Sequence, residues 1–418
     1  MSGHNLPLMA WRNLWRNRRR TLITLSSIIF GVFFAVMMAA MQDRNWDEMI
    51  DLGARLGGGH VTIQHVDYRE TPSLKLTVQN TAQLVDLAHQ QAPVEKITQR
   101  ISGPVMLNTA GASYGAGFIA FDPQQEDAST LSLLTPEALA EGALFQRSDE
   151  KGIILGQRLA QNLGADLGDK VIYTFTDKSG EIVSGLARLS GVVRTGAPGL
   201  DASLALLPLD TTRKILGYTS DEASQLAIFI EDQRDSSAIA QQIGQALGNQ
   251  VDVLPWSSAR PELAAFVAMK VGGARFASAL IALLVAAGIF NTLFVSVMER
   301  LREFGILMAL GFTPLRLFGL VMFESLWLAL VGLFGAALFT LGPYLYLESI
   351  GVDISAMMAE QGTMDIAGVA MSTTLKVGIF QDSLILIVVF ALFATLLAGL
   401  YPAWRAGTVD PVDSIKLV

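Results

Sequence analysis

Four long apolar runs interrupt an otherwise mixed chain, at residues 21–42, 276–298, 317–347 and 383–404. About 20 helical residues cross the roughly 30 Å hydrocarbon core of a bilayer, so each run predicts a transmembrane helix. The third run contains one acid, Glu324. We expect Glu324 to be a partnered structural acid, because an ion-coupled transporter usually needs more ionisable groups inside its spans.

The polar sequence between the first two runs predicts a large domain at residues 43–275. Short strand-like runs alternate there with amphipathic helical runs, a pattern typical of an α+β fold. The strands are expected within residues 60–66, 117–121, 170–175, 186–193, 226–230 and 250–254. The helices are expected at residues 81–91, 157–163, 208–216 and 236–247, with helical extensions of the first two spans at residues 45–56 and 257–275.

The distribution of arginine predicts the orientation of the spans. Five arginines and no acid precede the first span, and Arg300, Arg302 and Arg316 follow the second. Positive flanks stay in the cytoplasm, so residues 1–20 are expected to form a cytoplasmic amphipathic helix, 299–316 a cytoplasmic helix and 405–418 a cytoplasmic tail. Acids outnumber bases in residues 43–275 and in the loop 348–382. These two segments are therefore expected outside, in the periplasm, with both termini inside.

A cleaved signal peptide is the competing interpretation of the first run. Its apolar stretch is longer than the 7–15 residues typical of a signal peptide, and the arginine-rich segment before it carries Leu8, Trp11, Leu14 and Trp15 at helical spacing. Tryptophans suit a helix lying in the membrane interface, so a retained membrane helix is favoured.

Composition agrees with a membrane protein and excludes several kinds of chemistry. Of 418 residues, 51% are hydrophobic and 16% charged, and there is no cysteine. Disulfides and thiolate metal sites are therefore excluded, and a net charge of −8 disfavours a nucleic-acid partner. His60 and His65 lie five apart in a predicted strand and make a poor metal pair. We expect no metal site and no catalytic residue, and without a phosphate-binding loop the chain is not expected to hydrolyse ATP.

Three short segments resemble the FtsX and MacB type of ABC transporter permease, also called type VII. They are MERLREFGILMALG at residues 298–311, AWRNLWRNRRRT at 10–21 and GLYPAWRAGTVDPVDSIK at 399–416. GQRLA at 156–160 and GDKV at 168–171 resemble the MacB-like periplasmic core domain of that family. MacB itself carries a fused ATPase that this chain lacks, so the layout is most similar to the lipoprotein-releasing permeases LolC and LolE.

The resemblance implies that the segment after the second span is a coupling helix, which receives motion from a separate ATPase. An interfacial helix that only anchors the turn is the alternative. Its charged residues are expected at a solvated end, its apolar residues, Ile306 and Leu307 included, are expected to be buried, and Gly311 is expected to end the helix. The implied coupling residues are Glu299, Arg300, Arg302, Glu303, Phe304, Gly305, Leu310 and Gly311.

Two further groups of residues are assigned from the spans. Gly332, Gly335, Gly399 and Ala403 are small residues that permit close helix packing, within one protomer or between two. Large apolar residues of the first span are candidates for a lateral cargo entry, with lipid contact or core packing as the alternative. They are Phe30, Phe33, Phe34, Met37 and Met41.

The family resemblance implies a permease subunit of the bacterial inner membrane that transmits ATPase motion to its periplasmic domain. Two ATPase subunits would carry ATP and Mg²⁺, and a second permease chain, identical or paralogous, would complete the transporter. The expected cargo is a lipoprotein or a lipid-like molecule, with a periplasmic carrier, adaptor or lipoprotein as a further partner. A MacB-like efflux permease, an FtsX-like regulator of a cell-wall hydrolase and a sensor without transport are the alternatives.

Overall fold

A computed structural model describes residues 6–353, 365–366, 369–370 and 374–408 of the chain. The expected periplasmic loop and cytoplasmic tail therefore lie partly outside the described residues. The chain forms two compact units. The helical unit contains residues 6–45, 269–353 and 374–408, and the inserted domain contains residues 46–268. Helices α2 and α9 each contribute to both units.

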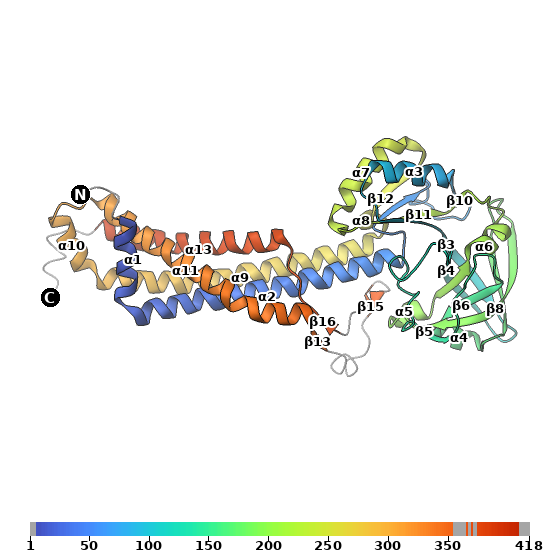
Figure 1. Ribbon diagram of the computed structural model, residues 1–418, viewed down its shortest axis with the longest axis horizontal. Coiled ribbons are helices and arrows are strands. Elements are labelled where there is room, and N and C mark those ends of the chain that lie inside the picture. The colour runs from blue at the N-terminus through green and yellow to red at the C-terminus, as the bar shows by residue number, and fades with distance from the viewer. Residues whose placement is uncertain (1–5, 354–364, 367–368, 371–373, 409–418) are drawn as a thin grey trace. The chain divides into compact units, whose positions relative to one another are not determined.

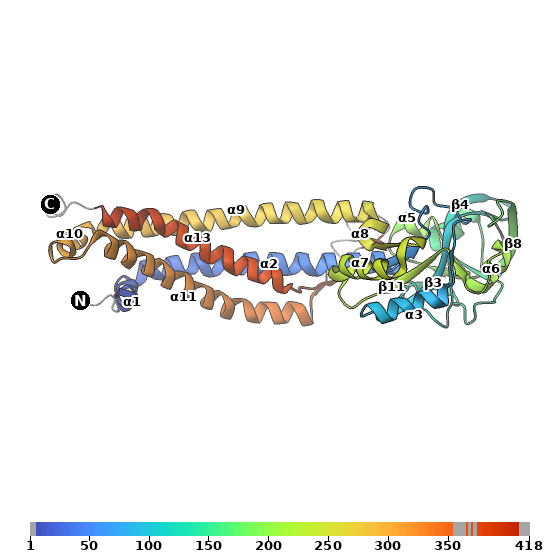
Figure 2. The ribbon, with the colours of Figure 1, turned by 90° about the horizontal axis from the view of Figure 1, so that it is seen from above.

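The helical unit contains four long helices, a short helix at its N-terminus and another between α9 and α11 (Figure 1). Each of the four is long and apolar enough to span a membrane, and among the described residues no other helix is. Helices α1 and α10 lie at the same end of this unit in both views (Figure 2). The helices are α1 (Leu6–Arg16), α2 (Arg18–Arg55), α9 (Pro261–Glu299), α10 (Leu301–Ala309), α11 (Pro314–Ser349) and α13 (Gln381–Gly407). A short strand pair, β13 (Val352–Asp353) with β16 (Thr374–Leu375), follows α11.

Glycines set the distance between helices in this unit. A Cβ at Gly332 would lie 2.6 Å from Ile28 Cγ2, and one at Gly335 would lie 2.8 Å from Ile29 Cδ1, so α11 packs directly on α2. A Cβ at Gly399 would collide with the side chain of Ser325, which brings α13 against α11. Ala403, one turn further along α13, is fully buried. All four small residues therefore lie at helix contacts within one protomer.

The inserted domain is built on a mixed sheet with the order β12-β1-β11-β3-β4-β9-β6-β8-β5, in which β7 also pairs with β3 and β8. The strands are β1 (Val61–Gln64), β3 (Lys96–Asn108), β4 (Ser113–Phe121), β5 (Leu139–Gly142), β6 (Gly152–Gly156), β7 (Lys170–Thr176), β8 (Ile182–Val193), β9 (Leu204–Pro208), β11 (Gln225–Phe229) and β12 (Asp252–Pro255). Two short pairs lie off this sheet: β2 (Val78–Gln79) with β10 (Glu222–Ala223), and β14 (Asp365–Ile366) with β15 (Val369–Ala370).

Strand β3 belongs to two parts of the domain. Residues 96–100 pair with β11, whereas residues 101–108 pair with β4. We name the part containing β1, β11, β12, α3 (Thr81–Gln91) and α7 (Ser236–Leu247) the first lobe; it has its own apolar core. The second lobe contains β4 to β9, α4 (Gln157–Leu163), α5 (Pro198–Asp201) and α6 (Leu209–Leu216), around two further cores. The change of partner along β3 therefore marks the boundary between the lobes (Figure 1).

The predicted fold class is confirmed. The chain has four apolar helices, and a large α+β domain is inserted in the sequence between the first and the second. The predicted helices of the domain are present, and α2 is continuous through its predicted extension. The extension predicted at residues 257–275 is interrupted at Arg260, because Pro261 disfavours a helical conformation in the residue before it, so α9 begins only at Pro261. Gly168 has φ +90° in the turn before β7, where only glycine is free of strain. A short helix, α8 (Trp256–Ala259), precedes α9.

Replacing Gly332 with leucine should destabilise the helical unit, because the new side chain would overlap Ile28. Overpacking of this kind costs about 1–3 kcal/mol, and the thermal unfolding midpoint in detergent should fall. Gly319→Leu is the matched control, since Gly319 lies in the same helix with no atom within 4 Å of its Cβ direction. Equal midpoints for the two variants would contradict the close α2–α11 contact.

Candidate functional site

The short helix α10 lies in the turn between two spanning helices and is held by an apolar anchor. Phe304 is fully buried in a cluster with Val297, Leu317, Val321, Ala403 and Ala406. These partners come from α9, α11 and α13, so one side chain ties α10 to three helices. Gly311, with φ +96°, follows the end of α10, and its N–H donates to Met308 O at 2.9 Å. The predicted helix stop is confirmed.

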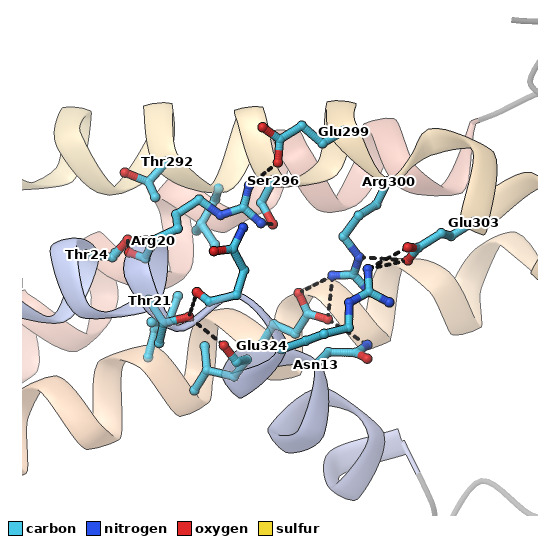
Figure 3. A pocket seen from close by; sticks show the side chains of 15 residues that line it. Asn13, Arg20, Thr21, Thr24, Thr292, Ser296, Glu299, Arg300, Glu303 and Glu324 are labelled. Atoms are coloured by element: carbon cyan, nitrogen blue, oxygen red, sulfur yellow. Dashed lines mark hydrogen bonds and ion pairs between the residues drawn. The ribbon is translucent and has the colours of Figure 1, made fainter. Parts of the chain in front are cut away.

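A buried ion pair joins the start of α10 to the interior of α11. Arg300 Nη1 donates to both oxygens of Glu324, at 3.0 and 3.1 Å. Both side chains are largely buried, with exposures of 11% and 8%. Asn13 Nδ2 of helix α1 donates to Glu324 Oε1 at 2.9 Å (Figure 3). Glu324 therefore has the partners expected of a structural acid, and the contact links three helices.

Two further ion pairs, which are more exposed than the Arg300–Glu324 pair, extend this network to α1 and α2. Arg16 Nη2 contacts both oxygens of Glu303, at 2.5 and 2.8 Å. Arg20 donates to Glu299 Oε2 at 2.5 Å and to Ser296 Oγ at 2.8 Å. Burial raises the pKa of Glu303, but hydrogen bonds from Arg16 and Arg300 outweigh it and hold the pKa below its usual value. Glu303 is therefore ionised at neutral pH.

These side chains line a cavity of about 340 Å³ between α1, α2, α9, α10 and α11 (Figure 3). Its wall is mostly polar and combines three arginines with three glutamates, together with the hydroxyls of Thr21, Thr24, Thr292 and Ser296. In the part of the chain that the structure describes, no group of three or more metal-ligating side chains occurs. The arrangement suits mechanical attachment of one helix to another.

The structure separates the predicted coupling residues into two groups. Glu299, Arg300 and Glu303 point into the ion-pair network, and Phe304 and Gly305 are buried. Arg302, Ile306, Leu310 and Gly311 are exposed, while Leu307 is half-buried. Placing Arg300 at a solvated end was wrong, because the Glu324 carboxylate in α11 draws its guanidinium inward. Ile306 and Leu310 were expected to be buried, but no other part of the described chain covers them.

Sequence reasoning did not find the partners that α1 and the start of α2 supply. Asn13, Arg16 and Arg20 were assigned only to an amphipathic, positively charged flank, yet each binds an acid of the other helices. The available signal was the balance of charge, since Glu299 and Glu303 follow the second span and Glu324 lies within the third. Glu324, at least, needs a polar or cationic partner, because its carboxylate lies inside an apolar helix.

The candidate cargo-entry residues differ in exposure and in their contacts within the protomer. Phe30, Phe34 and Met41 are exposed, whereas Phe33 and Met37 are half-buried. The rings of Phe30 and Phe33 pack edge-on against Phe339 of α11, with centroids 5.3 and 5.1 Å apart. Part of this set therefore belongs to the α2–α11 contact within one protomer.

Four spanning helices and an inserted α+β domain define a multi-pass membrane protein. A family model described as FtsX-like permease C-terminal matches residues 275–411, and one described as MacB-like periplasmic core domain matches residues 21–246. The chain therefore belongs to the MacB and FtsX family of ABC transporter permeases, type VII. This confirms the resemblance carried by the three sequence segments.

Curated relatives agree with this assignment. LolC of Xylella fastidiosa, a lipoprotein-releasing system transmembrane protein, is 24% identical over 70% of this chain and 71% of its own length. The pyoverdine export ATP-binding/permease protein PvdT of Pseudomonas syringae is 24% identical over 97% of this chain, which spans 58% of PvdT. Among solved structures, the periplasmic region of MacB from Actinobacillus actinomycetemcomitans is 13% identical over 51% of this chain and 96% of its own, with a TM-score of 0.34.

Removing one member of the buried pair should destabilise the helical unit more than removing both. Glu324→Leu removes the buried partner of Arg300 and leaves its guanidinium with only the longer 3.3 Å contact to Glu303; breaking a buried pair typically costs about 3–5 kcal/mol. The double variant Arg300→Met/Glu324→Leu removes both charges and should unfold at a higher temperature than the single variant. Thermal unfolding in detergent measures both midpoints. A double variant as unstable as the single one would contradict the assigned pairing.

The Arg16–Glu303 contact should respond to acid. A pKa lowered by folding contributes stability above the unfolded value, about 4.3 for glutamate, and that stability is lost as pH falls through the lower folded value. The difference in unfolding midpoint between the parent protein and Glu303→Gln should therefore be constant above about pH 5 and shrink below about pH 4. Solvent exposure limits it to about 1 kcal/mol or less. A difference that already shrinks between pH 7 and 5 would contradict this assignment.

Proposed function

We propose that the chain receives motion from a separate ABC ATPase at helix α10 and transmits it through the spanning helices to its periplasmic domain. The ATP and Mg²⁺ would be bound by that ATPase, and ATP hydrolysis would occur there. The work would be done on a lipoprotein or another lipid-like cargo of the inner membrane. The surface of α10 is the observation that carries this proposal.

Helix α10 and the turn after it present an apolar, positively charged surface. Leu310, just after α10, is 75% exposed, and Leu315, in the first turn of α11, is 77% exposed. Ile306 of α10 is also exposed, by 46%. Arg302 and Arg316 are exposed nearby, and neither makes an ion pair within the described chain. Exposed leucines rimmed by charge are typical of a protein interface. An apolar groove with acidic edges on an ATPase would complement this surface.

The attachments of α10 explain how a push on that surface would travel. Phe304 ties α10 to α9, α11 and α13, and the Arg300–Glu324 pair fixes its first residue to α11. Arg16 and Glu303 add a contact with α1. A displacement of α10 would therefore move neighbouring helices as well, which is the behaviour required of a coupling helix.

Charge supports the proposed orientation. Six arginines lie at the end of the helical unit that carries α10, and their side chains form no ion pair or hydrogen bond within the described chain: Arg12, Arg18, Arg19, Arg302, Arg316 and Arg405. Because arginine-rich flanks remain in the cytoplasm, we place this end, with both termini, in the cytoplasm of a bacterium. The inserted domain is then periplasmic. Two such chains, or one with a paralogue, would assemble with two ATPase subunits.

The nature of the cargo rests on relatives and on the surface of α2. A relative is named for lipoprotein release, and exposed Phe30, Phe34 and Met41 would contact an amphiphile that enters from the lipid side. Export of a small molecule is the second candidate, because PvdT, named for pyoverdine export, matches nearly the whole chain. A periplasmic carrier would accept a lipoprotein, whereas an adaptor would serve export. An FtsX-like regulator of a cell-wall hydrolase would move neither.

Purification of the tagged protein in mild detergent tests the ATPase contact and identifies retained lipid-linked molecules by mass spectrometry. The double variant Leu310→Ser/Leu315→Ser should lose the ATPase. Burial of one leucine contributes about 1.5–3 kcal/mol, and 1.4 kcal/mol is tenfold in affinity, so affinity should fall about 100-fold or more.

Ile350→Ser/Val352→Ser is the matched control, because these residues are also exposed but lie at the other end of α11. It should retain the ATPase. Equal retention by both double variants would reject the α10 surface as the docking site. Absence of any ATPase with the parent protein, while a control permease retains its own, would reject the proposed function.

A further inference from the structure

The end of helix α2 meets the sheet of the inserted domain at one buried arginine. Arg100 lies on β3 at the last position that pairs with β11, opposite Gln225, and the next residue, Ile101, already pairs with β4. Its side chain is fully buried, as is that of its partner Glu126. Arg100 therefore stands at the boundary between the two lobes.

All five N–H groups of this guanidinium have acceptors. Nε donates to Glu126 Oε1 at 2.7 Å, and Nη2 donates to Glu126 Oε2 at 2.5 Å and to Thr130 O at 2.7 Å. Nη1 donates to Arg55 O at 2.9 Å and to Gly57 O. A guanidinium has five donors in a fixed planar arrangement. Lysine, with three donors on a flexible stem, cannot make this set of contacts.

The acceptors belong to two segments that are far apart in the sequence. Arg55 O and Gly57 O are carbonyls at the C-terminal end of α2, where they have no partner within the helix. Glu126 and Thr130 lie in the turn that follows β4, and Leu131 of that turn is part of a second-lobe core. Arg100 thus binds the end of α2 to the second lobe.

The first lobe is attached to α2 in a different way. The chain leaves α2 and enters β1 directly, and His60 N donates to Ile228 O of β11 at 2.8 Å. The second lobe has no such covalent path from α2. Besides the Arg100 contacts, it has packing from Leu56 and one hydrogen bond from Arg55 Nη1 to Ala128 O, at 3.3 Å.

Stability alone is a weak reason for this arrangement. Replacing a buried ion pair by apolar residues of similar volume is often neutral or stabilising, because the charges lose their hydration. Five directional hydrogen bonds instead fix geometry. They hold the end of α2 in a defined orientation relative to β3 and to the turn that follows β4, which apolar packing does not do.

We propose that Arg100 is the joint through which movement of α2 reaches the second lobe. This inference rests on the proposed function, since it assumes that ATPase motion arrives along α2. With the joint intact, both lobes follow the end of the helix. Without it, the first lobe still follows through β1, while the second lobe, then held mainly through the shared strand β3, follows less closely and the angle between the lobes varies more widely.

The distance between the lobes tests this joint. The chain has no native cysteine, so Gln90→Cys on α3 and Gln161→Cys on α4, both exposed, give one label in each lobe. Paired spin labels would be measured in nanodiscs, in the complex with the co-purified ATPase, without nucleotide and with ATP plus vanadate. The parent protein should give a narrow distance distribution that shifts with nucleotide.

The test variant is Arg100→Met/Glu126→Met, which removes both charges and leaves none unpaired in the core. It should broaden the distance distribution and lose the nucleotide-dependent shift, while ATP hydrolysis by the complex continues. Lys178→Met/Glu222→Met is the matched control: this ion pair lies in the same domain and does not contact α2. The control should retain the shift, and unfolding midpoints would show that both variants are folded.

Each other outcome is decisive. If the parent protein shows no shift although ATP is hydrolysed, the proposed transmission itself fails. If the parent shifts and the Arg100 variant shifts equally, transmission stands and the joint is rejected. If the test variant does not fold, Arg100→Lys replaces it, since it keeps the charge beside Glu126 and loses hydrogen bonds to α2; a normal shift in that variant rejects the joint.

Discussion

The position of helix α10 depends on a carboxylate buried in the interior of α11. Glu324 lies inside an apolar helix and needs a partner, because an unpaired charge in this environment is costly. Arg300 supplies the partner, and to reach it the chain must turn at the end of α9. Phe304 then enters the apolar cluster, and the remaining surface of α10 faces outward. One buried charge therefore determines which side of α10 is left exposed.

A similar buried arginine–glutamate pair, Arg100 with Glu126, occurs at the C-terminal end of α2. Arg300 and Arg100 are both buried arginines that bind a glutamate through two oxygens, and both lie where a long helix meets another segment. Arginine suits this task because its donors are planar and fixed. The two arginines differ in how many of their N–H groups have protein acceptors. Arg100 uses all five N–H groups on protein acceptors, whereas Arg300 shares its surroundings with a polar cavity. The joint in the domain is thus the more rigid of the two.

Much of the architecture was predictable because it follows from periodicity and charge. The spans are apolar over more than 20 residues, and the helices at residues 81–91 and 236–247 show clear amphipathic spacing. Strand β3 was missed although it is the longest in the sheet. Its sequence contains a charged residue at a buried position, Arg100, and Gly103-Pro104 in its middle. Both features usually argue against a central strand. Only the tertiary partner Glu126 makes a buried Arg100 favourable.

The candidate site was predictable in its position but not in its contacts. The charged turn after the second span was recognised, and Gly311 was identified as its end. The directions of Glu299 and Glu303 depend on partners over 270 residues away in the sequence, Arg20 and Arg16. No local pattern encodes such a pairing. Which residues of α10 are exposed and which are buried therefore depends on the three-dimensional arrangement of α1 and α11.

The ion pairs around α10 differ in strength, so this region is attached more firmly to some neighbouring helices than to others. The Arg300–Glu324 pair is buried, so separating it exposes two charges to an apolar surrounding and costs several kcal/mol. The Arg16–Glu303 and Arg20–Glu299 pairs are partly exposed, and water replaces such contacts at a cost of about 1 kcal/mol or less. Helix α10 is therefore bound firmly to α11 and more loosely to α1, and the Arg20–Glu299 pair adds a contact between α2 and the end of α9. A force applied to α10 would move α11 with it, and α2 would follow because Gly332 and Gly335 pack α11 directly on Ile28 and Ile29.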